Sequence, residues 1–265
     1  MAKSGQARVL SPSQFQYVLE VIEQKRHPEK NSCIMNISFK LGLRVQEISL
    51  LQIKEVAKLS PAEDRGYRLL DILSLPASYT KGANAHNKGV SKSPYNRRVI
   101  SFKVDDFDNV VSQIVALAKA GADIDPSTFY PAIEKRSGTS RDLPMVDQAL
   151  RESLFRYLDL RISKDPGLKP TDPLFVTQKS GPYSPNTLQD HMALILKEWA
   201  GIEKASSHSG RRSVATDILH GQKQTIRVAQ KALGHKTPAT TVLYDEPPEE
   251  VLKEALKSVG SKYKG

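Results

Sequence analysis

The stretch Leu233-Gly234-His235-Lys236-Thr237-Pro238-Ala239-Thr240-Thr241-Val242-Leu243-Tyr244 predicts the end of one helix and nearly the whole of the next. A glycine directly after an apolar helical stretch is a common C-terminal cap, so Gly234 predicts that a helix over residues 225–233 ends there. Thr237 followed by Pro238 is typical of a helix start, which predicts a short helix over residues 238–244. His235 then lies in the turn between the two helices, and Tyr244 lies at the far end of the second.

Two earlier stretches carry charged side chains at helical spacing. Gly42-Leu43-Arg44-Val45-Gln46-Glu47-Ile48 places Arg44 at a helix start and Glu47 three residues on, close enough to orient it. Ser206-Ser207-His208-Ser209-Gly210-Arg211-Arg212 puts His208 and Arg211 on one helix face. Taken singly, each of these side chains is more often a surface or packing residue than a catalytic one. Their occurrence together, in this order and spacing, favours a shared site.

Together these side chains suit attack by a tyrosine hydroxyl on a phosphodiester. The guanidiniums of Arg44 and Arg211 can donate paired hydrogen bonds to phosphate oxygens and stay charged throughout. The hydroxyl of Tyr244, whose ordinary pKa is about 10, needs a base or a positive field, and His208 can serve as that base. His235 can donate to a phosphate oxygen, and a lysine can protonate the leaving 5′-oxygen. Since no carboxylates are spaced for magnesium, we expect neither metal nor cofactor.

The remaining pattern predicts one α+β domain made of helices and a small antiparallel sheet. Ser11-Pro12-Ser13-Gln14 is a capping box that opens the first helix, and Gly42 ends the second. Helices are expected near residues 12–22, 31–41, 44–48, 104–119, 146–161, 185–199, 210–220 and 249–257, and strands near 69–75, 97–102, 141–145 and 173–177.

The charge balance favours a polyanionic partner. The chain of 265 residues has 39 Lys+Arg against 29 Asp+Glu, a net charge of +10. One basic run without an acidic residue predicts a hairpin tip that contacts DNA; it contains Lys81, Lys88, Lys92, Arg97, Arg98 and Lys103. The single cysteine excludes an intramolecular disulfide and a cysteine-based zinc site. Without a long apolar run or a hydrophobic leader, we expect a cytoplasmic protein with no membrane partner.

The order Arg, Lys, His-x-x-Arg, His, Tyr resembles the signature of the tyrosine recombinase (phage integrase) family. The similarity extends to GLRVQE, PLFVTQKSGPYSPNTL and LGHKTPATTVLY, the last with its tyrosine nine residues after the histidine. The resemblance implies a mostly helical integrase-type catalytic domain with a small antiparallel sheet. It implies that Arg44, Arg211 and His235 hold the phosphate, that His208 assists proton transfer, and that Tyr244 forms a 3′-phosphotyrosyl bond without ATP.

The resemblance also implies a domain layout. Residues 1–10 are expected to form a short N-terminal extension, residues 11–247 the catalytic domain, and residues 248–265 a C-terminal helix and tail. This corresponds to a single-domain form that lacks the N-terminal core-binding domain of most members. An insertion is expected somewhere within residues 82–140. Gly210 stands where the family often has leucine, which predicts the loss of a packing side chain.

Because of this expected insertion, the sequence does not decide which lysine corresponds to the catalytic lysine in the family's hairpin. Lys81 stands at the family's distance after Arg44, and Lys135 stands at the usual distance before His208. We favour Lys81, with Lys88 as a weaker candidate, and assign the others as nonspecific phosphate contacts. The helix opened by Ser184 and Pro185 carries Asn186 and Gln189, which are predicted either to read base edges in the major groove or to form a solvated polar face.

We therefore predict a site-specific DNA recombinase from a prokaryotic cell or a mobile element. Its expected partners are double-stranded DNA, further copies of the same chain, and accessory DNA-bending proteins. We expect a monomer in solution and a tetramer on paired DNA sites. Two alternatives remain open: a type IB topoisomerase-like relaxase, and a DNA-binding accessory protein whose active site is retired. An RNA-binding protein is disfavoured because aromatic residues are only 6% of the chain.

Overall fold

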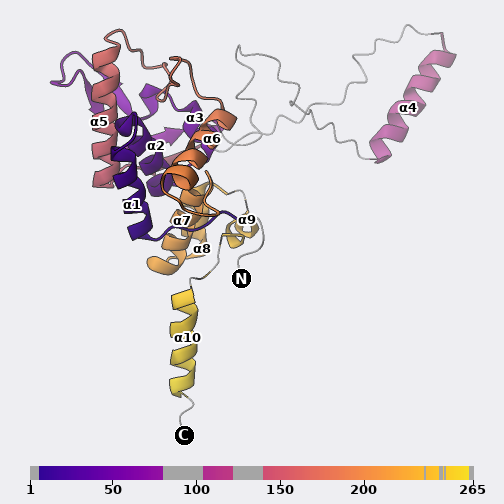
Figure 1. Cartoon of the computed structure of the whole chain (residues 1–265). Coiled ribbons are helices and arrows are strands. Elements are labelled where there is room, and N and C mark those ends of the chain that lie inside the picture. The colour runs from indigo at the N-terminus through magenta and orange to yellow at the C-terminus, as the bar shows by residue number, and fades with distance from the viewer. Residues whose placement is uncertain are drawn as a thin grey trace. The chain divides into compact units, whose positions relative to one another are not determined.

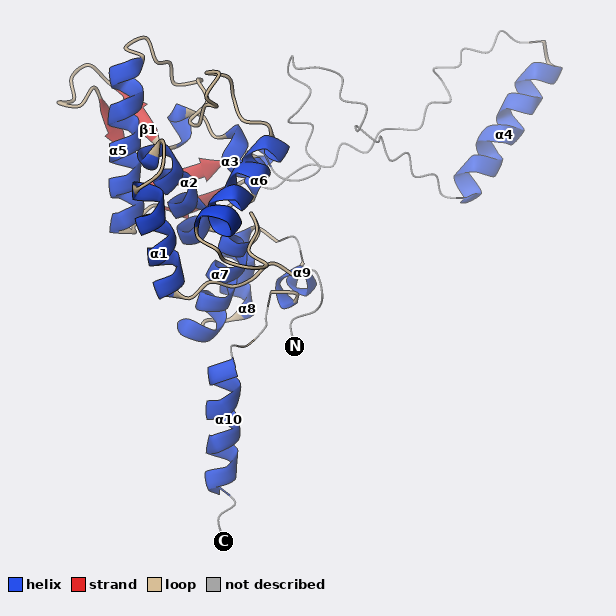
Figure 2. Ribbon diagram, viewed as in Figure 1, coloured by secondary structure: helices blue, strands red, loops and turns tan. Residues whose placement is uncertain are grey.

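The computed structural model describes residues 6–79, 104–121, 140–235, 237–244, 247 and 249–262. The chain divides into two compact units, residues 1–81 with 138–265, and residues 82–137. Helix α4 (Val104–Lys119) belongs to the second unit and has the bounds that its periodicity predicts. All other elements belong to the first unit and are predominantly helical, as expected (Figures 1 and 2).

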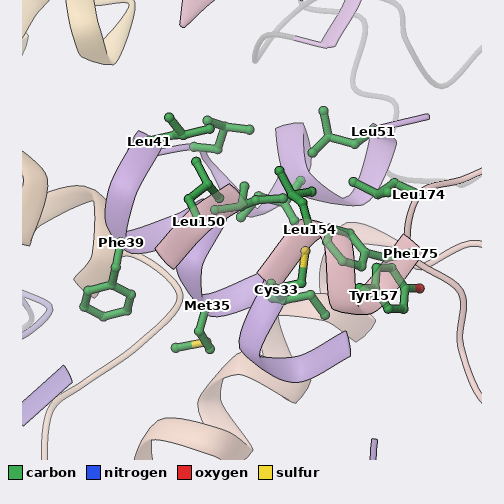
Figure 3. Close-up of a cluster of buried hydrophobic side chains, with 14 of the residues drawn as sticks. Cys33, Met35, Phe39, Leu41, Leu51, Leu150, Leu154, Tyr157, Leu174 and Phe175 are labelled. Carbon is green, nitrogen blue, oxygen red and sulfur yellow. The ribbon is translucent and has the colours of Figure 1, made fainter. Parts of the chain in front are cut away.

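Three helices enclose the main core. Helix α1 (Pro12–Glu23) begins with the predicted capping box at Ser11, and α2 (Pro28–Leu41) packs against both α1 and α5 (Gln148–Lys164). Helix α2 is buried along nearly its whole length and ends at Gly42, which has the left-handed φ of 62° of a glycine cap. Figure 3 shows part of the buried core, with Cys33, Met35, Phe39 and Leu41 of α2 and Leu150, Leu154 and Tyr157 of α5 among the residues drawn.

Two small antiparallel sheets follow the short helix α3 (Val45–Leu50). After the 3₁₀ turn Ile53–Glu55, strand β1 (Ala57–Leu59) pairs with β2 (Tyr67–Leu69). Strand β3 (Ile72–Leu75) pairs with β4 (Arg141–Pro144), with Leu75 opposite Arg141. The second 3₁₀ turn, Ala77–Tyr79, continues from β3. The unit of residues 82–137 is therefore inserted between two strands that form one hairpin.

The C-terminal half is helical. Helix α6 (Pro185–Ala193) continues into the π-helical segment Leu194–Trp199, and α7 (Ser209–Thr216) continues into the π-helical segment Asp217–Gly221. Helix α8 (Ile226–Leu233) ends at Gly234, whose φ is 62°, and α9 (Pro238–Val242) begins after Thr237, as the opening stretch predicts. Helix α10 (Glu249–Lys262) follows. None of the helices in the described ranges is long and apolar enough to span a membrane.

Two sequence predictions are wrong. Residues 173–177 form no strand, only isolated bridges, because the chain turns back and Thr177 N donates to Gly181 O at 2.8 Å. Gly210 also loses no packing side chain: a Cβ there would lie 2.3 Å from Ser38 Oγ and 2.8 Å from the Ser38 backbone. Helix α7 approaches α2 too closely for any side chain at this position. The predicted strand over residues 97–102 lies outside the described residues.

Candidate active site

The first part of the site is a buried carboxylate shared by two arginines. Arg44 caps α3, and its backbone N–H donates to Glu47 Oε2 at 2.7 Å while its Nη1 donates to Oε1 at 3.0 Å. Arg141, the first residue of β4, donates from Nη2 to the same Oε2 at 2.6 Å. The Glu47 side chain is fully buried, whereas that of Arg44 remains 24% exposed. Glu47 thus orients Arg44, as predicted, and leaves part of its guanidinium open to solvent.

Arg211 lies near this pair and is almost completely buried. Its Nη1 donates to Gly42 O at 2.7 Å and its Nη2 donates to Leu233 O, so it joins the end of α2 to the end of α8. The two turns touch, since a Cβ on Gly42 would lie 2.9 Å from a Leu233 methyl carbon. Burial, with Arg44 nearby, lowers the pKa of Arg211 to about 10, so its charge persists at neutral pH.

The C-terminus of α8 is capped by two arginines. Arg141 Nη1 donates to Ala232 O at 2.8 Å, next to the bond from Arg211 to Leu233 O. These carbonyls lie in the last turn of a helix, where they have no partner within the helix and carry partial negative charge. The two cations therefore fix the turn that carries His235.

His235 is held neutral in this cationic setting. Burial, followed by the charges of Arg211, Arg44 and Arg141, lowers the pKa of His235 to about 3. Its Nδ1 lies 2.8 Å from the Oγ1 of Thr241, which is itself fully buried. When the Thr241 hydroxyl donates to Nδ1, the neutral ring carries its proton on Nε2 and can donate there.

Tyr244 and His208 border one small cavity. The cavity has a volume of about 340 Å³ and is lined by Gln6, Ala7, Ser206, His208, Arg212, Leu243 and Tyr244. Tyr244 is partly exposed, and its ring centroid lies 5.1 Å from that of His235. His208 is exposed at the N-terminus of α7, and its backbone N–H donates a hydrogen bond to Ser206 Oγ at 3.2 Å. The five described residues of the predicted catalytic set therefore lie around one region.

This region holds buried donors that suit an anion. Arg211 Nε, Arg141 Nε and His235 Nε2 are buried and have no hydrogen-bond partner among the residues described. Unpaired buried donors cost free energy in a folded protein, so their collection beside the open guanidinium of Arg44 indicates a site for a negatively charged group. The part of the chain that the structure describes contains no cluster of metal-ligating side chains.

The other predicted residues that the structure describes are not among those that line this cavity or bond the arginines. Asn186 and Gln189 are exposed on α6, which leaves both readings of that helix open. The remaining basic candidates lie outside the described residues; they are Lys81, Lys88, Lys92, Arg97, Arg98 and Lys135.

Arg141 and Thr241 are two residues of the site that the sequence does not predict. No local pattern pairs Arg141 with Glu47, which lies 94 positions earlier in the chain. Thr241 carried a local signal that was overlooked. It lies six residues after His235 and three before Tyr244, on the helix that joins them.

Comparison with known proteins identifies relatives of this arrangement. The phage integrase family model matches residues 109–250. The tyrosine recombinase XerC of Methylobacterium sp. (strain 4-46) is 36% identical over 91 residues, 34% of this chain and 28% of that protein. XerD of Corynebacterium glutamicum is 36% identical over 116 residues, 43% of this chain and 35% of that protein. The chain thus spans about a third of the length of these curated relatives.

Solved structures share the fold at low sequence identity. The crystal structure of XerA recombinase superposes with a TM-score of 0.59 at 20% identity, covering 95% of this chain and 64% of that one. XerH recombinase bound to a palindromic difH substrate gives a TM-score of 0.57 at 18% identity, covering 96% of this chain and 53% of that one.

Proposed function

Because the chain belongs to the phage integrase family, whose model covers more than half of its 265 residues, we propose that it is a site-specific DNA recombinase. It cuts and rejoins DNA strands through a covalent 3′-phosphotyrosyl intermediate on Tyr244. The observation that carries this proposal is the gathering of Arg44, Arg211 and His235, with unpaired buried donors, next to the tyrosine. The XerC and XerD relatives, which are named tyrosine recombinases, support it.

The cationic groups hold the scissile phosphate. Three arginines against one buried carboxylate leave an excess of positive charge, and a phosphodiester gains negative charge as it becomes five-coordinate. Arg211 already gives one bond from each terminal nitrogen to a backbone carbonyl, so its Nε is the donor we assign to the phosphate. Arg44 contributes the exposed side of its guanidinium, and His235 contributes Nε2–H.

Proton transfer accompanies the exchange of one phosphorus–oxygen bond for another. The Tyr244 oxygen attacks phosphorus while its proton passes to His208, which borders the same cavity. The bond to the 5′-oxygen breaks, and a lysine of the connection between β3 and β4 protonates that oxygen. A similar phosphodiester is made and broken, so no ATP or metal is required by this scheme. Lys81 is our preferred lysine and Lys135 the alternative.

Double-stranded DNA is the proposed substrate, and two of the similar structures, the XerH recombinase and the Tn1549 transposon integrase, are complexes with DNA. We assign Asn186 and Gln189 on α6 to the major groove, and the basic residues between Lys88 and Arg98 to phosphates. As an enzyme of prokaryotic or mobile-element DNA it acts in the cytoplasm, and accessory DNA-bending proteins assist it.

We further propose that four copies assemble on paired sites through α10. This helix exposes Val251, Leu252, Leu256 and Val259, which recur at helical spacing. The catalytic unit offers a groove of about 1210 Å³, whose apolar lining includes Leu10, Phe15, Leu19, Phe39, Val214 and Ile218, and Val251 of the same chain borders it at one point. We assign α10 of one copy to the groove of the next, which leaves the isolated chain a monomer.

The decisive experiment uses a nicked DNA duplex whose cleaved fragment is lost by diffusion, so that the covalent product accumulates. DNA flanking the coding region supplies the candidate sites, which are short inverted repeats. A protein–DNA adduct on a denaturing gel that persists in EDTA and disappears in Tyr244→Phe supports the proposal, and its absence on every candidate site contradicts it. Incubation with two sites separates a recombinase, which gives exchanged products, from a topoisomerase-like relaxase, which gives none. An intact protein that binds DNA without forming adducts fits the accessory-protein alternative.

A further inference from the structure

We propose that Arg141 is a positioning residue that sets the geometry of the phosphate site from two sides. It holds the Glu47 carboxylate that orients Arg44, and it holds the end of α8 that carries His235. This inference rests on the proposed function, because the groups that Arg141 positions are those we assign to the scissile phosphate. Arg141 lies in none of the three family-like stretches quoted above, and its assignment comes from its contacts.

The first side is the Glu47 carboxylate. Arg141 Nη2 and the Arg44 backbone N–H occupy Oε2, at 2.6 Å and 2.7 Å, so the Arg44 side chain meets the carboxylate through Oε1 alone. An arginine and a carboxylate left to themselves favour a paired contact through two nitrogens. Arg141 therefore prevents Glu47 from taking a second nitrogen of Arg44. That nitrogen stays available to the phosphate.

The second side is the turn after α8. Arg141 Nη1 donates to Ala232 O at 2.8 Å, three residues before His235. The stem of Arg141 lies against the same turn, since a Cβ on Gly234 would lie 2.9 Å from Arg141 Cδ and 3.2 Å from Nη1. Gly234 is thus required both by its positive φ and by the close approach of Arg141.

One guanidinium therefore bridges two parts of the site that lie far apart in the sequence. Its side chain is 7% exposed, and burial lowers its pKa while the Glu47 charge opposes that change. The planar guanidinium of an arginine holds two donor nitrogens in a fixed geometry, one for Glu47 and one for Ala232. A lysine keeps the charge, but its single nitrogen cannot reach both partners. The two-sided contact, and not charge alone, is what the role requires.

Arg141 also connects the site to the β3–β4 hairpin. It is the first residue of β4 and pairs with Leu75, the last residue of β3. The connection between these strands includes both candidate lysines. In the sequence, Arg141 follows three residues after position 138, where the catalytic unit resumes.

The test compares Arg141→Lys with Arg151→Lys. Arg151 also bonds backbone carbonyls and a carboxylate, those of Leu70, Met145 and Asp71, but takes no part in the site. Single-turnover cleavage of the nicked duplex and DNA affinity are measured for each variant. We expect Arg141→Lys to cleave about 100-fold more slowly, the loss typical of a misplacement near 1 Å, with DNA affinity within about threefold of wild type. Arg151→Lys should cleave like wild type.

A second measurement keeps the positioning role separate from the reaction. NMR of the Arg44 Nε–H and the His235 ring, recorded without DNA, should show both signals displaced in Arg141→Lys and unchanged in Arg151→Lys. Unchanged signals, or cleavage within threefold of wild type, overturn the inference. The two proposals can fail separately. If the wild-type protein forms no adduct on any candidate DNA, the proposed function is overturned. If the Arg44 and His235 signals still move in Arg141→Lys, the positioning role stands.

Discussion

The Nδ1 atom of His235 lies 2.8 Å from the Oγ1 atom of Thr241, inside a short segment that ends at Tyr244. Thr241 is fully buried, and its carbonyl accepts a hydrogen bond from the Tyr244 backbone N–H at 2.9 Å. One threonine therefore contacts the histidine that we assign to the phosphate and the backbone of the nucleophile. When its hydroxyl donates to Nδ1, the proton of the neutral His235 ring is held on Nε2.

Replacing Thr241 with valine removes this hydroxyl without changing the shape of the side chain. Nδ1 of His235 is then buried without a partner, which costs about 1–3 kcal/mol of unfolding free energy. Nε2–H is no longer enforced, so we expect cleavage about 100-fold slower, comparable to the loss of one donor to a developing charge. Thr240→Val is the control, because its hydroxyl contacts the Thr237 hydroxyl at 3.2 Å on an exposed surface. Equal effects of the two substitutions would contradict the assignment.

Acid should destabilise the folded chain through two histidines that the folded structure holds neutral, His235 and His191. The pKa of His235 is lowered to about 3 and that of His191 to about 4, in each case first by burial. Unfolded histidine binds a proton near pH 6.5, so between about pH 6.5 and 4 the unfolded chain binds more protons than the folded one. The free energy of unfolding therefore falls as the pH falls through this window.

Urea unfolding at pH 7.0, 5.5 and 4.5 measures this dependence. His235→Asn should reduce the slope of unfolding free energy against pH by about one proton, or about 1.4 kcal/mol per unit in the middle of the window. His191→Asn, which removes the ring that contacts Tyr183, should act in the same direction. A slope identical to wild type in both variants would show that neither ring is held neutral. Bound DNA should raise the pKa of His235, because phosphate offsets the arginine charges.

Gly210 is the contact point between α7 and α2. An alanine is a better helix former by about 1 kcal/mol, yet its Cβ would overlap Ser38. We expect Gly210→Ala to lower the free energy of unfolding by about 1–3 kcal/mol through overpacking. Cleavage should also slow, because the next residue is Arg211. Gly167→Ala is the control, since its Cβ would meet only Asp165 Oδ1, at 3.5 Å. A Gly210→Ala variant as stable as wild type would refute the close contact.

Local signals in the sequence predict much of this fold. The capping box at Ser11, the glycine ends at Gly42 and Gly234, and the start at Thr237 are each decided by neighbouring residues, and the structure confirms them. Contacts between distant segments carry no such signal. Arg141 with Glu47 and Gly210 with Ser38 depend on how helices and strands pack, so the first was missed and the second was misread.

Deleting residues 251–265 tests the assembly through α10. We expect the pairing of two DNA sites to weaken far more than binding to one site, since the deleted segment faces a neighbouring copy in our proposal. Leu256→Ser should reproduce part of the loss, because Leu256 is 63% exposed on the apolar face. Lys257→Ser is the matched control. Gel-shift titrations with one and two sites separate the two steps, and an equal loss in both would argue against the exchange of α10.

The choice between Lys81 and Lys135 depends on which one protonates the leaving oxygen. Strand β3 ends at Leu75 and β4 begins at Arg141, so each lysine stands six residues from its strand and the strand pairing alone does not separate them. We expect Lys81→Met to slow cleavage by about 100-fold or more, the contribution typical of a general acid. Lys135→Met should mainly weaken DNA binding, with a shallower dependence on salt.

A modified substrate tests the chemical role directly. When sulfur replaces the leaving 5′-oxygen, the thiolate departs without protonation, since a thiol has a pKa near 8.5 and an alcohol one many units higher. The variant that lacks the general acid should then cleave at nearly the wild-type rate, whereas a variant that lacks a phosphate contact should stay slow. Recovery in Lys135→Met and not in Lys81→Met would reverse our choice. Recovery in neither would mean that the proton comes from a residue outside this pair.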